Sequence, residues 1–286
     1  MTIAISINVN DGIVLAADSA GTLSTQTTNN APPTIVQVYN NANKIVNLCK
    51  GLPIGAIFWG NGAIGKASIS TLLKDLRDRF SGKVTAPADW TLDRRTYTVA
   101  DVAAKVKTYL IDDQYTPTFA SWPQKPMMGL IVAGYSASGG DAEEYKIEVD
   151  AQGNCTGPTP VRSNHGWGAI WAGEPEAVTR LLNGYSPVLS KAIEGAIGVP
   201  AARIDVALQQ SATLPAQIIS PAMPIQDAID VAEFLVELTS KYSRYTPGAA
   251  TVGGPVEVAA ITKHEGFRWV KRKYYFSADL NPEPRT

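Results

Sequence analysis

The feature that most constrains the fold is the alternation of side chains at the start of the chain. From residue 3 to residue 9, isoleucine or valine alternates with alanine, serine and asparagine, which is the period of a β-strand with one buried face. Residues 10–12 read Asn-Asp-Gly, a sequence typical of hairpin turns, and residues 13–18 return as a second, largely apolar run. We therefore expect the chain to begin inside an antiparallel sheet, with residues 3–9 forming a half-buried strand.

Apolar spacing along the rest of the chain predicts an α+β fold. It predicts a helix over residues 69–80 and a second helix that Thr98 caps. The other predictions are strands at 44–48, 54–59, 127–136, 144–150, 168–172 and 256–261, a hairpin extension over 267–275, and helices that begin at 174–176 and span 225–242. This order favours two sheets packed face to face with a helix pair on each outer side. We expect one domain over residues 1–286, with insertions near 19–43 and 81–97 and a short strand at 34–38.

Charge and cysteine content exclude several classes of partner and site. The chain has 25 Lys and Arg against 26 Asp and Glu, so no net field attracts it to nucleic acid or to anionic membranes. No long apolar stretch predicts a membrane span, and Cys49 and Cys155 fit neither a disulfide framework nor a zinc site, which favours the cytoplasm. The two histidines lack metal-ligand spacing, which argues against a zinc hydrolase. Chemistry at an N-terminal threonine needs no metal and no organic cofactor, so we expect neither.

Thr2 carries the main functional hypothesis. Removal of Met1 would leave Thr2 with a free amine at the start of the first strand, so that one residue would hold both a nucleophilic hydroxyl and a base. The amine must be neutral to accept a proton, and a nearby cation in a partly desolvated site favours the neutral form. Lys44, at the start of an apolar strand, is the candidate cation, and Asp18 is the carboxylate that a buried lysine requires.

The register of the first hairpin bears on this hypothesis. A two-residue loop at 11–12 would place Asp18 opposite Ile5, on the wrong face of the sheet. A three-residue loop with Gly12 in the left-handed conformation places Asp18 opposite Ala4, on the face that the hypothesis requires. We therefore predict the second register.

A glycine-rich turn offers a candidate for stabilising an oxyanion. Residues 60–65 read Gly-Asn-Gly-Ala-Ile-Gly between a predicted strand and a predicted helix, which is a literal dinucleotide-binding fingerprint. The acidic residue expected about 20 residues later is missing. A plain tight turn is a second interpretation. In the third, the amides of Gly60, Asn61 and Gly62 lie at a helix N-terminus and donate to an oxyanion.

These segments resemble the N-terminal half of a proteasome β subunit or of the bacterial HslV protease. The resemblance lies in Thr-Ile-Ala-Ile at residues 2–5, in Asp-Gly-Ile-Val-Leu-Ala-Ala-Asp-Ser at 11–19, in Asn-Lys-Ile at 43–45 and in the turn at 60–62. The C-terminal half follows the family pattern more weakly, and its ending is most similar to the Anbu branch of bacterial proteasome homologues. The resemblance implies a four-layer α/β/β/α sandwich and a threonine-type peptidase or amide hydrolase, with Thr2 as nucleophile and Asp18 and Lys44 as its support.

The resemblance also implies partners, and the chain departs from the family at accessory positions. A peptide or protein substrate is expected, together with a homo-oligomeric ring or open spiral formed through the flanking helices. A Gly-Ser-Gly of the family is replaced by Trp-Ala-Gly at residues 171–173, and Ala-Ala-Thr-Val at 249–252 stands where an aspartate and a serine are common. Ser19, Thr246 and Thr251 are the candidate accessory groups.

Each member of the site also has a plainer interpretation. Thr2 would be an ordinary residue behind a retained Met1, Asp18 would cap a turn with Ser19, and Lys44 would be a solvated lysine at a strand end. For the whole protein, the alternatives are a catalytically silent subunit that keeps the fold and the assembly, and a dinucleotide-binding protein that uses the turn at 60–65.

Overall fold

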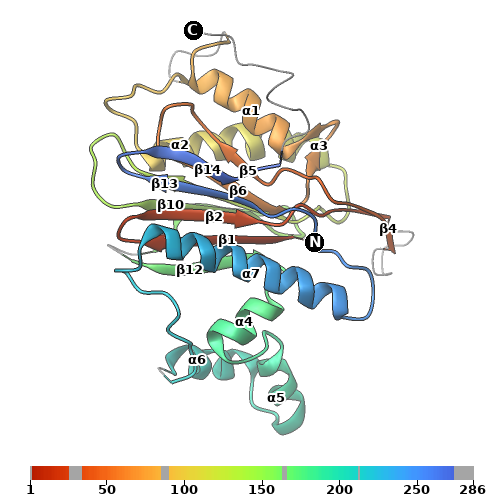
Figure 1. Ribbon diagram of the computed structural model, residues 1–286. Helices are drawn as coiled ribbons and strands as arrows, with labels where there is room; N and C mark the ends of the chain where they lie inside the picture. The colour runs from red at the N-terminus through yellow and green to blue at the C-terminus, as the bar shows by residue number, and fades with distance from the viewer. Residues whose placement is uncertain (1, 26–33, 85–89, 163–165, 212, 274–286) are drawn as a thin grey trace.

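The computed structural model describes residues 2–25, 34–84, 90–162, 166–211 and 213–273 (Figure 1). Helices and β-sheets are both present, and every strand pair among these residues is antiparallel. The predicted α+β class is therefore confirmed.

Two five-stranded sheets make up most of the β-structure. The sheet that contains the first strand, called the N-terminal sheet below, has the order β12-β1-β2-β13-β14, and the second sheet has the order β11-β10-β9-β6-β5. The strands of the N-terminal sheet are β1 (Ile3–Val9), β2 (Gly12–Ala17), β12 (Gly168–Gly173), β13 (Glu257–Thr262) and β14 (Gly266–Lys271). Those of the second sheet are β5 (Ile45–Asn47), β6 (Ile54–Gly60), β9 (Met128–Gly134), β10 (Glu143–Val149) and β11 (Cys155–Pro160). Two short ribbons pair β3 (Gly21–Thr25) with β4 (Thr34–Tyr39) and β7 (Ala63–Ile64) with β8 (Ala67–Ser68).

The helices form two groups that lie on opposite sides of the sheets. The first group is α1 (Ile69–Phe80), α2 (Val99–Lys107), a π-helical segment η2 (Thr108–Tyr115) and α3 (Thr116–Phe119). The second group is α4 (Glu176–Asn183), α5 (Leu189–Ile197), α6 (Ala201–Gln210) and α7 (Ile225–Tyr245). Figure 1 shows α1 and α2 on one side of the sheets and α4 and α7 on the other.

Three buried apolar clusters connect these elements. One contains side chains of β1, β2 and β13 together with side chains of β5, β6 and β9, so the two sheets pack against each other. A second joins the second sheet to α1, α2 and η2, and a third joins the N-terminal sheet to α4 and α7. Each sheet therefore has apolar contacts on both faces, which is why the inner strands β1, β2, β6 and β9 are buried and carry few polar residues.

The helices at 69–80 and after Thr98 begin where the sequence predicts. The Ser68 hydroxyl accepts the N–H of Thr71 at the start of α1, and the Thr98 hydroxyl accepts the N–H of Asp101 at the start of α2. Such caps stabilise helix starts because the first N–H groups of a helix have no acceptor within the helix.

Several elements were not predicted, among them β11, α5 and α6. Strand β11 contains Gly157, Pro158 and Pro160 and lies at the edge of its sheet, where proline removes no ladder hydrogen bond. Helices α5 and α6 bury no apolar side chain, and Ser190 is the one residue of the pair classed as buried. The apolar residues 189, 192, 193, 196 and 197 of α5 do follow the spacing of a helix, so the signal for this element was present in the sequence and was overlooked.

The prediction that residues 3–9 form a half-buried strand was wrong, because all seven residues are buried. Helix α7 covers the face that carries Ile3, Ile5 and the other odd-numbered residues, and the second sheet covers the even-numbered face. The polar side chains on the even face are satisfied internally: the Ser6 hydroxyl donates to Glu144 Oε1 at 2.5 Å, and Asn8 Nδ2 donates to the carbonyl of Gly166 at 3.2 Å.

The predicted hairpin register was also wrong. Val9 pairs with Gly12 and Ala4 pairs with Ala17, so the loop consists of residues 10 and 11 alone. Gly12 has a φ of 157° and lies in β2, outside the left-handed helical region. Asp18 consequently follows the last paired residue of β2, and the alternation of the strand no longer determines where its carboxylate points.

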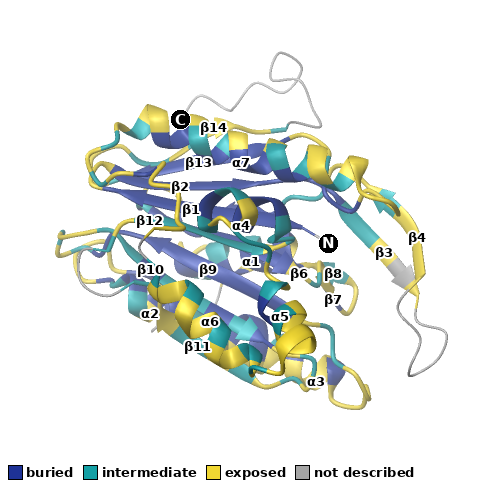
Figure 2. Cartoon of the chain, turned by 90° about the horizontal axis from the view of Figure 1, so that it is seen from below, coloured by how far each residue is buried: buried dark blue, intermediate teal, exposed yellow. Residues whose placement is uncertain are grey.

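The first insertion contains a projecting ribbon. The short strand predicted at 34–38 is confirmed as β4, which pairs with β3 and extends away from the body of the protein (Figure 2). Residues 26–33 of this insertion, residues 85–89 of the insertion at 81–97, and the end of the strand predicted over 267–275 lie outside the described residues.

Candidate active site

Thr2 lies at the wall of a cavity of about 620 Å³. It directly precedes β1, and 5% of its surface is exposed. Its carbonyl oxygen accepts the N–H of Glu174 at 2.8 Å, which fixes its backbone against the end of β12. The same cavity is lined by Lys44, Gly60 and Ser70. Met1 lies outside the described residues.

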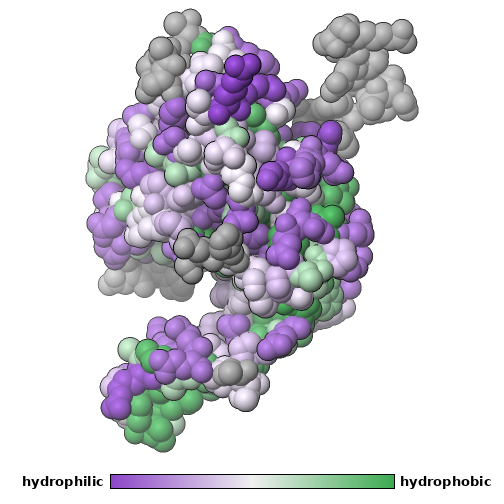
Figure 3. Space-filling view, turned by 90° about the vertical axis from the view of Figure 1, so that its left-hand side faces the viewer, coloured by the Kyte–Doolittle hydropathy of each residue, from purple (hydrophilic) through white to green (hydrophobic). Residues whose placement is uncertain are grey.

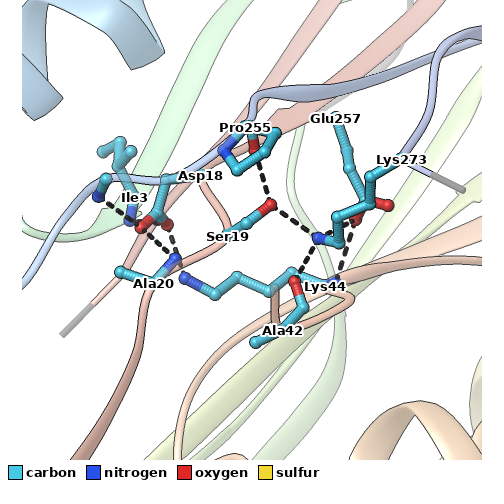
Figure 4. A network of polar contacts seen from close by, with 10 residues as sticks. Ile3, Asp18, Ser19, Ala20, Ala42, Lys44, Pro255, Glu257 and Lys273 are labelled. Atoms are coloured by element: carbon cyan, nitrogen blue, oxygen red, sulfur yellow. Dashed lines mark hydrogen bonds and ion pairs between the residues drawn. The ribbon is translucent and has the colours of Figure 1, made fainter. Parts of the chain in front are cut away.

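The carboxylate of Asp18 is the centre of a buried polar network (Figure 4). Its Oδ1 accepts the N–H of Ile3 at 3.1 Å and a hydrogen bond from Lys44 Nζ at 2.5 Å. Its Oδ2 accepts the N–H groups of Ala20 and Gly253, each at 3.0 Å. Because Ile3 is the residue after Thr2, one carboxylate oxygen connects the start of the chain to the Lys44 ammonium.

Burial determines the electrostatics of this pair. Asp18 is fully buried and Lys44 is 4% exposed, so the interpretation of Lys44 as a solvated strand-end lysine is wrong. Burial lowers the pKa of Lys44, and the adjacent Asp18 carboxylate opposes that change. Asp18 does close a local turn through Ala20, but its other three donors come from distant segments.

A second ion pair, which the sequence analysis missed, joins the buried Glu257 to the partly buried Lys273 next to the first pair. Lys273 Nζ lies 3.4 Å from Glu257 Oε2, and the same oxygen accepts the backbone N–H of Lys44 at 3.4 Å. Burial lowers the pKa of Lys273, and Glu257 opposes the change. Glu257 is 1% exposed. The available signal was its charge within the otherwise apolar run at 256–261.

The three accessory candidates take different positions. Ser19 is buried in the network: its hydroxyl donates to the carbonyl of Pro255 and accepts a hydrogen bond from Lys273, both at 2.5 Å. Thr246 and Thr251 line a separate cavity of about 400 Å³, which does not include Thr2. The structure therefore does not bring these two threonines to the cavity at the start of the chain.

The turn at 60–62 does not lie at a helix N-terminus, so that prediction was wrong. The β7–β8 ribbon separates it from α1, whose N-cap is Ser68. The N–H of Asn61 donates to the carbonyl of Met127 at 2.9 Å, so this amide is already engaged. Gly60 and Gly62 line the cavity with Thr2. The antiparallel pairing and the intervening ribbon also remove the strand–turn–helix context that a dinucleotide fingerprint requires.

Gly60 is the better-placed amide of the turn. Phe58 donates its N–H to the carbonyl of Lys44 at 3.1 Å. N–H groups two residues apart in a strand point to the same edge, so the N–H of Gly60 points to the same edge of β6 as that of Phe58. Strand β5 pairs with residues 55–57 of β6 and does not extend alongside Gly60. The residue must be glycine, because its φ is +80° and an added Cβ would lie 2.5 Å from the carbonyl oxygen of Met127.

A glycine also supports the position of Thr2. Gly173 pairs with Ile3 at the end of β12, has a φ of +98°, and leaves room for the carbonyl oxygen of Thr2, which would lie 1.9 Å from an added Cβ.

We expect Gly173→Ala to destabilise the protein and to displace Thr2. A non-glycine residue in this backbone conformation costs about 1–3 kcal/mol, and the collision with the Thr2 carbonyl adds to that loss. Gly168→Ala is the matched control, because Gly168 lies in the same strand with a φ of +121° and nothing within 4 Å of its added Cβ. Urea unfolding measures both variants, and equal losses of free energy would contradict the steric argument.

Neither a scan against protein-family models nor a search of curated proteins found a match to this chain. No helix in the described part of the chain is both long enough and apolar enough to span a membrane. The same residues contain no group of three or more histidine, cysteine, aspartate or glutamate side chains arranged to hold a metal ion.

Proposed function

We propose that the protein is an N-terminal threonine hydrolase that cleaves peptide or amide bonds through an ester of Thr2. The observation that carries the proposal is the shared Asp18 oxygen, which holds a buried Lys44 ammonium beside the residue that follows Thr2. A cation at this position favours the neutral form of a Thr2 amine, which is the form that accepts a proton.

The proposed reaction needs only groups that meet in this cavity. After removal of Met1, the Thr2 amine takes the hydroxyl proton while Oγ1 bonds to the carbonyl carbon of the substrate. The Gly60 amide donates to the oxyanion. The amine then gives the proton to the leaving nitrogen as the C–N bond breaks, which leaves an acyl ester on Thr2. Water, deprotonated by the same amine, hydrolyses the ester and restores the hydroxyl.

The arrangement of layers supports the same family of enzymes. Two face-to-face sheets with helices outside each of them are the arrangement that we assign to the four-layer α/β/β/α sandwich of the proteasome-like hydrolases. A reactive residue at the start of a strand, as Thr2 is before β1, fits such an enzyme.

The proposal extends to assembly through the flanking helices. Helices α5 and α6 pack on each other and project from the body, and Figure 3 shows apolar surface at the tip of the projecting part. Val188 is 59% exposed, Ile197 is 68% exposed and Val206 is 52% exposed. Exposed apolar groups of this kind are typical of interfaces, and we assign them to contacts between copies of the chain in a ring or open spiral.

The decisive experiment combines mass spectrometry of the native protein with a peptide epoxyketone, which reacts only with an amine and a hydroxyl on the same residue. We expect a chain that begins at Thr2 and carries one adduct on that residue. Lys44→Ala should lose the adduct, whereas Lys241→Ala should keep it, since the Lys241 side chain is 73% exposed. A native chain that retains Met1 and forms no adduct would contradict the hydrolase and favour a catalytically silent assembly subunit.

A further inference from the structure

Another cavity of about 400 Å³, separate from the Thr2 cavity and from the one lined by Thr246 and Thr251, lies between α1, β14 and the segment around β5. Positive charge dominates its wall. The cationic residues that line it are Lys50, Lys74, Arg77, Arg268 and Arg272. They come from three separate parts of the chain, so the tertiary structure, and no single run of sequence, gathers them.

Among the described residues, four of these five cations have no carboxylate partner. In the part of the chain that the structure describes, Lys50, Lys74, Arg77 and Arg268 form no ion pair. The guanidinium of Arg272 lies over the ring of Trp269, 4.8 Å from its centroid. The one acid of the wall is Glu257, whose carboxylate is held by Lys273.

A buried hydrogen-bond donor at this cavity also lacks a partner. The hydroxyl of Ser70 forms no hydrogen bond within the described structure. Ser70 is only 6% exposed and lines the cavity. A buried hydroxyl without a partner is destabilising relative to a satisfied one, so a ligand that accepts a hydrogen bond from Ser70 removes a penalty that the unliganded protein carries.

We propose that this cavity binds a small multivalent oxyanion, with several phosphate or carboxylate groups on one molecule. Arginine and lysine side chains bind such groups through charge-assisted hydrogen bonds. The volume lies within the usual range of small-molecule sites, roughly 300–1,000 Å³. This inference concerns a site separate from Thr2 and does not depend on the proposed hydrolase activity.

The position of the cavity connects it to the candidate active site. Asn43 and Ser70 line both this cationic cavity and the Thr2 cavity. Glu257, at the wall of the cationic cavity, accepts the backbone N–H of Lys44. An oxyanion bound here would lie against Asn43 and Ile45, the residues on either side of Lys44 in the chain.

Calorimetric titration of the full chain with inorganic triphosphate tests the proposal, with citrate as a parallel titration that separates phosphate from carboxylate ligands. We expect saturable binding of at least one of the two, weakened by added salt because exposed charges are screened. The double variant Lys74→Gln/Arg77→Gln should bind the anion roughly tenfold more weakly or worse, because the loss of one hydrogen bond to a charged group lowers affinity by about that factor.

Two further variants keep the result unambiguous. Arg268→Gln removes one cation from the opposite wall and should weaken binding while leaving α1 unchanged. Lys191→Gln/Arg203→Gln removes the same number of charges as the double variant, from exposed positions on α5 and α6, and should bind like the wild type. Absence of saturable binding of both anions, or equal affinities in all variants, would overturn the site whether or not Thr2 is reactive.

Discussion

Thr2→Ala is expected to reduce amide hydrolysis by roughly 10⁴-fold or more, the scale seen when a catalytic nucleophile is removed. The substitution deletes the hydroxyl that forms the acyl ester and leaves the amine in place. The free energy of unfolding should change by less than about 1 kcal/mol, because the change is a small truncation at the edge of a cavity. Single-turnover cleavage of a fluorogenic peptide measures the rate, and urea unfolding measures the stability.

Two companion variants sharpen this prediction. Thr2→Ser retains both a hydroxyl and an amine on one residue, so it should keep a measurable rate and still react with the epoxyketone. Thr213→Ala removes the same atoms from an exposed threonine and should leave the rate unchanged. Cleavage by Thr2→Ala at the wild-type rate would show that the nucleophile lies elsewhere.

Lys44→Met is expected to cause a large loss of stability. It leaves the fully buried Asp18 carboxylate without its counter-charge, and breaking a buried ion pair in this way costs about 3–5 kcal/mol. The three backbone N–H groups that Asp18 accepts remain and place the expected loss toward the lower end of that range. Urea unfolding of the purified chain measures the difference.

The matched control is Lys241→Met, which removes an exposed lysine whose ion pair with Glu237 spans 3.8 Å. Exposed pairs of this kind contribute at most about 1 kcal/mol. Adding Asp18→Asn to Lys44→Met should recover part of the lost stability, because the buried group is then neutral. If Lys44→Met and Lys241→Met lose the same amount, the Asp18–Lys44 pair does not support the start of the chain.

Local sequence patterns were sufficient to predict many individual helices and strands. Helices α1 and α2 follow from apolar spacing and a capping hydroxyl, both of which act within a few residues. Strand β11, whose stability depends on its place at the edge of a sheet, left no comparable periodic signal. The apolar spacing of α5 was present in the sequence and was overlooked.

The candidate site was likewise predicted in part from the sequence and in part not. Asp18 and Lys44 were paired on the chemical ground that a buried lysine requires a carboxylate, and the structure places them 2.5 Å apart. The hairpin register predicted to bring them together was wrong, because the observed register differs and Asp18 lies just beyond the last paired residue of β2. The amides proposed at a helix start are separated from α1 by a ribbon of four paired residues, which short-range patterns did not reveal.

The sequence alone determined which residue types were available for chemistry: a threonine before the first strand, one carboxylate and one lysine at strand ends, and glycines at a turn. Those properties depend on covalent order and on local periodicity. The tertiary structure decided which of them meet, and it added Glu257 and Lys273, whose burial beside Lys44 results from contacts between residues more than 200 positions apart. Desolvation and Coulomb interactions act through space, so only the packed chain defines the charge that surrounds Thr2.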